Sequence, residues 1–220
     1  MTLTFNAGRV AASAVAALAL TLVGSVPGSA AAVTDPPNDF LSTFNGPHNG
    51  DLDVLAANVT LNGSNLDFTA TLNGTVGETA GAVYVFGLDR GMGTPKFANI
   101  GNPGVIFDST FVISNTGTGT LKDLIAKTTA PVSDVTLSGA TISGVVPVSD
   151  LPSEGFSPNN YTFNLWPESG AANAGNTEIS DFAPDNAMAR VTATPEPASV
   201  SLFGMAAIGA LAMLRRRKSA

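Results

Sequence analysis

Acidic side chains that could bind a cation gather in two stretches of the sequence. The first stretch, 35–53, interleaves aspartates with asparagines, and the second, 178–185, brackets a Phe-Ala-Pro segment. Carboxylate and amide oxygens are the ligands that calcium prefers, although this spacing matches no EF-hand loop. The candidates are Asp35, Asp39, Asp51 and Asp53 in the first stretch and Glu178, Asp181 and Asp185 in the second.

A calcium site would require these two stretches to meet in the fold. They would do so if the first and last strands of the chain were neighbours. Asp and Asn are also common in loops because their side chains cap turns, and we favour this interpretation. Calcium is therefore a hypothesis, and we assign no metal-ligating residue from the sequence.

Catalytic side chains are few. His48 is the only histidine, and it lies in the stretch 45–50, which is typical of a loop, so we expect an exposed histidine rather than the base of a catalytic triad. The chain has no cysteine, which excludes thiolate chemistry and disulfides. A glycosidase would need two carboxylates about 5 to 10 Å apart. It would normally add aromatic platforms, whereas this chain has one Trp and two Tyr. We expect no catalytic residue, no cofactor and no enzymatic activity.

Alternation with a period of two dominates the rest of the chain. The segments 55–61 and 66–72 alternate apolar and polar residues around an Asn-Gly turn, which predicts a β-hairpin. We expect further strands at 82–88, 105–114, 121–129, 132–137, 141–146, 160–166 and 187–193, and a helical turn at 147–151. Eight or nine short strands predict an all-β fold, a single antiparallel β-sandwich of the jelly-roll kind.

Three of these strands are expected to build the core. The strand 82–88 is apolar on both faces, so it should lie centrally and be covered on both sides. The strand 105–114 carries Phe107 and Phe111 and should anchor the core beside it. The strand 160–166 points Tyr161, Phe163 and Leu165 inward and Trp166 the other way.

Both ends of the chain have the composition of targeting segments. Near the N-terminus, Arg9 precedes an apolar stretch, 10–23, and small residues end at Ala32, which predicts a secretory signal peptide over 1–32. At the C-terminus the tail 195–220 starts with a Pro-Glu-Pro motif and continues with an uncharged run, 198–214, long enough to span a bilayer as a helix. The motif is Pro195, Glu196 and Pro197, and the cations that follow the run are Arg215, Arg216, Arg217 and Lys218.

The segment between these ends, 33–194, is expected to fold as one secreted domain. Cations beside a membrane segment stay on the cytoplasmic side, which places this domain outside the cytoplasm. The segment 33–197 holds all 17 acidic residues but only five of the 10 basic ones, which gives it a net charge of −12. Such a surface would repel nucleic acid and is compatible with divalent cations and hydrated polysaccharide. A high net charge also serves solubility alone.

The C-terminal arrangement of motif, apolar run and basic cluster resembles the PEP-CTERM sorting signal of exported bacterial proteins. The resemblance implies that a membrane-bound exosortase, thought to act as a cysteine transpeptidase, recognises Pro195, Glu196 and Pro197, cuts nearby and passes the protein toward the cell surface or an exopolysaccharide matrix. The four terminal cations would hold the precursor in the inner membrane until then. The alternative is a plain tail anchor.

The start of the body, with Asp35, Pro36, Asn38, Asp39 and Phe40, resembles the opening of DOMON-like and carbohydrate-binding β-sandwich domains. We infer no haem site from this resemblance, because His48 is the only histidine. Two functions remain. The first is a surface or matrix protein with a non-catalytic structural or binding sandwich, and the alternative is a secreted carbohydrate-active enzyme that uses Asp and Glu.

Overall fold

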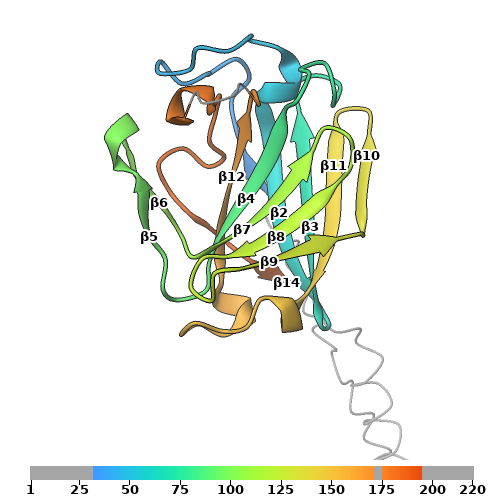
Figure 1. The fold of residues 1–220 in the computed structure, drawn as a ribbon, viewed down its shortest axis with the longest axis vertical. Helices are drawn as coiled ribbons and strands as arrows, with labels where there is room; N and C mark the ends of the chain where they lie inside the picture. The colour runs from blue at the N-terminus through green and yellow to red at the C-terminus, as the bar shows by residue number, and fades with distance from the viewer. Residues whose placement is uncertain (1–31, 171–174, 195–220) are drawn as a thin grey trace, which may run out of the picture.

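The computed structural model describes residues 32–170 and 175–194 and is all-β (Figure 1). The expected signal peptide, apart from Ala32, and the expected C-terminal tail lie outside the described residues. Helical structure in the described part is limited to short 3-10 turns, and none of its helices has the length and apolar character to cross a membrane. These turns are η1 (Gly50–Leu52), η2 (Ala98–Ile100), η3 (Val148–Asp150), η4 (Pro158–Asn160) and η5 (Gly175–Glu178).

The described strands form two six-stranded sheets and one two-stranded sheet. In the first sheet the order is β1, β2, β3, β11, β10, with β14 paired in parallel to β2. Its strands are β1 (Val33–Thr34), β2 (Val54–Asn62), β3 (Asn65–Leu72), β10 (Val135–Ser138), β11 (Thr141–Pro147) and β14 (Thr192–Ala193). The predicted hairpin and the predicted helical turn are both present, as β2 with β3 and as η3.

The second sheet has the order β13, β12, β4, β7, β8, β9 and is antiparallel throughout. Its strands are β4 (Val83–Asp89), β7 (Ser109–Ser114), β8 (Gly119–Asp123), β9 (Thr128–Val132), β12 (Thr162–Glu168) and β13 (Ala189–Arg190), and the small sheet pairs β5 (Thr94–Phe97) with β6 (Asn102–Phe107).

One hydrophobic core joins the two large sheets. The ring of Phe68 on β3 meets Phe86 on β4 and Phe111 on β7 edge to face, with ring centroids 5.2 and 5.1 Å apart. The inward stripe of Tyr161 and Phe163 packs in the same core, as expected. The sheets therefore face each other in a sandwich-like arrangement, while the jelly-roll assignment stays a prediction.

A second hydrophobic cluster covers the outer face of the second sheet. Trp166 on β12 packs against Phe97 and Phe107 of the small sheet and against Phe182. The Trp166 ring also lies over Gly87 of β4, where a Cβ atom would approach the ring to 2.6 Å. The prediction that 82–88 is central and covered on both sides is thus confirmed, as is the outward direction of Trp166.

Three predicted strands are broken in the structure, and two strands that were not predicted, β1 and β5, are present, so the described residues contain fourteen strands. The expected strand 105–114 divides at Asp108, so β6 belongs to the small sheet and β7 to the second sheet. The expected strand 121–129 ends at Asp123, whose Oδ1 accepts hydrogen bonds from the N–H groups of Ile125 and Ala126 and so stabilises a turn. The expected strand 187–193 divides at Val191 between the two large sheets.

A buried arginine connects the loops at one end of the sandwich. Arg90 is fully buried, and its Nε donates to Asp108 Oδ1 at 2.8 Å while its Nη1 lies 3.0 Å from Asp123 Oδ2. Nη1 also donates to the carbonyl of Pro152. Burial acts to raise the pKa of Asp123, but hydrogen bonds from Arg90 and nearby backbone N–H groups lower it overall. Asp123 therefore stays ionised, and both aspartates pair with Arg90 inside the protein.

Replacing this cation tests how far the fold depends on it. Arg90→Leu would leave Asp108 and Asp123 buried without their counter-charge, which we expect to cost about 3–5 kcal/mol of unfolding free energy. Denaturant unfolding measures the loss. The exposed cation of β8 provides the control, since Lys122→Leu should change stability by no more than about 0.5 kcal/mol. A loss below about 1 kcal/mol for Arg90→Leu would contradict this account.

Candidate metal centre

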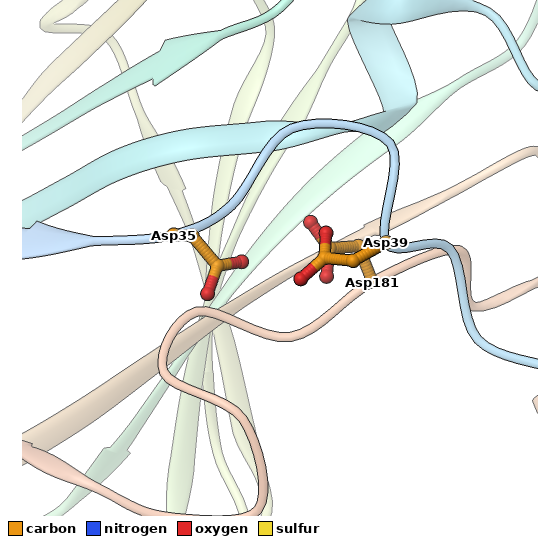
Figure 2. Close-up of side chains that lie close together, drawn as sticks. All are labelled: Asp35, Asp39 and Asp181. Atoms are coloured by element: carbon orange, nitrogen blue, oxygen red, sulfur yellow. The ribbon is translucent and has the colours of Figure 1, made fainter.

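Three aspartates from two distant parts of the sequence meet beside the start of β2. One carboxylate oxygen of each of Asp35, Asp39 and Asp181 lies within 4.8 Å of the others. Figure 2 shows that they come from two segments: Asp35 and Asp39 lie on the loop that follows β1, and Asp181 lies on the segment after η5. The two acidic stretches of the sequence therefore meet, as the calcium hypothesis required.

Backbone hydrogen bonds hold these segments in place. The N–H of Asp35 donates to the carbonyl of Leu55, which fixes the chain after β1 against β2. The N–H groups of Val54 and Phe182 donate to the two carboxylate oxygens of Asp181, at 2.9 and 2.7 Å. Asp181 is only 1% exposed, so its position is set by β2 and by its own loop.

Several carboxylate oxygens around this cluster lack a donor. Asp35 Oδ2, Asp39 Oδ1 and Asp53 Oδ1 are buried atoms with no hydrogen-bond partner in the described part of the chain. The other oxygen of Asp53 accepts from the N–H of Asn38 and from Asn73 Nδ2. A buried carboxylate oxygen without a donor is costly, so the cluster needs either bound protons or a cation.

Burial and mutual repulsion raise the pKa values of all three acids. Burial, followed by the charges of Asp181, Asp39 and Asp185, raises the pKa of Asp35 to about 8. Burial also raises the pKa of Asp181 to about 7 against the opposing hydrogen bond from Val54, with Asp39 and Asp53 adding to the rise. The pKa of Asp39 is raised too, first by burial. At neutral pH the cluster is therefore poised to hold a proton or a positive ion.

The geometry fits a hard divalent cation. Oxygens that bind one calcium ion at about 2.4 Å lie at most about 4.8 Å apart, which is the limit that these three satisfy. Calcium takes about six to eight oxygen ligands, so carbonyl groups or water would have to supply the others. Calcium at this site stays a hypothesis.

Other acidic candidates from the sequence are not part of this three-aspartate cluster. Asp51 accepts hydrogen bonds from the N–H and hydroxyl of Thr79 and from the Tyr84 hydroxyl, so it fastens a turn. Burial, and then the charge of Glu168, raise the pKa of Glu178. The interpretation that such residues organise turns thus holds for Asp51, while Asp35 accepts no hydrogen bond at its buried Oδ2.

His48 is an exposed loop residue, as predicted. Its ring stacks on Phe40 with centroids 4.4 Å apart and on Phe44 at 5.6 Å. The structure therefore gives His48 a packing role on the surface of the loop.

The described chain ends beside the β2–β3 turn. β14 pairs with β2 through Thr192 opposite Thr60 and Ala193 opposite Leu61, and the N–H of Thr194 then donates to the carbonyl of Leu61 at 2.9 Å. The sorting residues Pro195, Glu196 and Pro197 and the cations Arg215, Arg216, Arg217 and Lys218 lie outside the described residues.

Residues 193–218 match the family model of the PEP-CTERM protein-sorting motif. The chain therefore carries a PEP-CTERM sorting signal, which marks an exported protein that is targeted by exosortase and passes through a membrane-anchored precursor. No curated protein and no solved structure matches the chain. The resemblance of the body to DOMON-like and carbohydrate-binding domains stays a prediction.

The raised pKa values predict a pH dependence of stability. Asp35 has an ordinary pKa of 3.8 and a folded pKa of about 8, so the folded state binds more protons than the unfolded state between these values. Stability should therefore fall as the pH rises from about 4 to 8 when no divalent cation is present. Asp35→Asn should flatten this fall and raise Tm at pH 8 by about 2–4 °C, the shift that about 1 kcal/mol gives in a domain of this size. Melting curves in chelator, with the exposed Asp134→Asn as control, measure the effect, and equal slopes for all three proteins would contradict it.

A calcium ion would act on the same residues in the opposite sense. At pH 7.5, millimolar calcium should raise the Tm of the unaltered protein, because the ion binds only the folded cluster. Asp35→Asn should lose most of this rise and Asp134→Asn should keep it. Calorimetric titration that shows no heat, together with an unchanged Tm in excess calcium, would remove the calcium hypothesis.

Proposed function

We propose that this chain is an exosortase-processed protein of the bacterial cell surface or extracellular matrix, where its sandwich-like body serves as a non-catalytic structural or binding module. The match of residues 193–218 to the sorting motif carries this proposal. The matched range begins at Ala193, the last residue of β14, so the sorting signal directly follows the last strand of the folded body. Association with exopolysaccharide is part of the proposal, and the acidic surface would need a bridging cation to bind an acidic polymer.

The alternative, a secreted carbohydrate-active enzyme, has less support from the described residues. Trp166, Tyr84 and Tyr161 are the chain's only Trp and Tyr, and all three are at most 2% exposed, so none can stack on a sugar ring. Two surface hollows, of about 420 and 470 Å³, are lined by neither Asp35 nor Asp181. The observation that favours the alternative is the raised pKa of these two acids, a property of general acids. New reducing ends from a polysaccharide panel, lost in Asp35→Asn, would support the enzyme.

Alanine substitution of the motif tests the proposed sorting. A variant in which Pro195, Glu196 and Pro197 are all alanine should accumulate uncut in the membrane fraction, because the exosortase would lack its recognition residues. Cell fractionation and the mass of the mature C-terminus measure the outcome. Pro131→Ala, which alters an exposed proline of β9, is the control and should be processed normally. Normal processing of the triple variant would refute the proposed function.

A further inference from the structure

The C-terminal tail leaves the body at one particular end of the sandwich. Thr194 is bonded to Leu61, next to the turn between β2 and β3, and the N–H of Val148 donates to the carbonyl of Ser64 in that turn. We call this end the exit end. It consists of the loops 62–65, 89–93, 124–127 and 148–160, which Figure 1 shows gathered at the bottom of the molecule.

The exposed large hydrophobic side chains of the described residues all lie on the loops of the exit end. Met92 is 52% exposed, Leu124 38%, Ile125 39% and Phe156 40%. Single exposed apolar residues are ordinary on a protein surface. Here, however, all four lie at the end from which the tail departs, and we infer that this end contacts a partner.

The buried Arg90 network fixes the backbone beneath these side chains. The N–H of Phe156 donates to the carbonyl of Arg90, that of Met92 to Asp108 Oδ2, and that of Leu124 to the carbonyl of Asp108. Three separate loops are thus tied to one ion pair that is itself fully buried. The backbone that carries these apolar side chains is therefore fixed in position.

Chain length places this end close to the membrane in the anchored precursor. Only the three residues 195–197 separate Thr194 from the uncharged run that starts at Ala198. A fully extended chain spans at most about 3.6 Å per residue, so Ala198 lies within about 14 Å of Thr194. The headgroup zone of one leaflet is about 5–7 Å deep, so at most about 7–9 Å separates Thr194 from the outer edge of the headgroups.

We propose that the exit end rests on the lipid surface of the membrane that holds the precursor. Met92, Leu124, Ile125 and Phe156 insert at the boundary between headgroups and acyl chains, where apolar side chains gain free energy by leaving water. The exposed Lys127, in the same turn as Leu124 and Ile125, reaches the lipid phosphates. This inference rests on the proposed function, because it requires the anchored precursor. It also orients the body, since the aspartate cluster lies by Val54, at the far end of β2, and faces away from the membrane.

The absence of native cysteine allows a direct measurement. Ala126→Cys places a label in the turn 124–127 of the exit end, and Ala80→Cys places one just before β4, at the opposite end of the sandwich; both alanines are exposed. The full chain is purified from membranes of cells without exosortase and inserted into phosphatidylcholine–phosphatidylglycerol nanodiscs. Each cysteine carries an environment-sensitive fluorophore, and the lipid carries a spin-label quencher. We expect at least threefold stronger quenching at Ala126→Cys than at Ala80→Cys.

A second variant separates contact through these side chains from mere proximity. Leu124→Ser with Ile125→Ser in the Ala126→Cys chain should reduce the quenching at least twofold, with an unchanged Tm because both side chains are exposed. Equal quenching at the two labelled positions in an anchored chain overturns this inference alone. Protection of Ala126→Cys from aqueous iodide without quenching by lipid means a protein partner and also overturns it. A chain that does not fractionate with membranes overturns the proposed function and this inference together.

Discussion

The ion pair between Arg90 and Asp108 is the interaction on which one whole end of the molecule depends. Asp108 stands where the chain passes from the small sheet into the second large sheet, and Arg90 follows the central strand β4. The pair, with Asp123 and the carbonyl of Pro152, replaces the water that polar loop ends would otherwise require. Buried charge of this kind contributes less net stability than its contacts suggest, but removal of one partner is costly because it leaves the other charge buried and unpaired.

The opposite end of the sandwich has acidic groups without such a partner. Asp35, Asp39 and Asp181 share one site, and none of them forms an ion pair in the described residues. Buried carboxylate groups are thus neutralised in two ways within one fold. Arg90 supplies the positive charge at one end, and bound protons or an external cation would supply it at the other. In a chain that has no disulfide, the second arrangement would make the link between the N-terminal segment and the Asp181 loop respond to the medium.

Much of this fold can be read from alternation in the sequence, and the failures have specific causes. Alternation identified β2, β3, β4, β11 and β12, and it gave the correct directions for Phe163 and Trp166. It could not detect the break at Asp108, because Asp108 accepts a hydrogen bond from the N–H of Arg90, which only the folded chain brings near. The break at Asp123 depends on hydrogen bonds to residues two and three positions on, a local turn that the period-two pattern does not distinguish from a strand. The meeting of Asp35 with Asp181 depends on hydrogen bonds between each of their segments and the start of β2, which no local pattern encodes. The exposure of Leu124 and Ile125 was not predicted, because both residues fell within the expected strand 121–129.

The parallel pairing of β14 with β2 has a mechanical consequence. β2 ends at the exit end, and β14 runs in the same direction beside it. A pull on the tail from that end acts along β14, so its hydrogen bonds to β2 are loaded together in shear instead of being opened one at a time. Cleavage beyond Thr194 would leave this pairing intact, so the new C-terminus would stay fixed beside the β2–β3 turn.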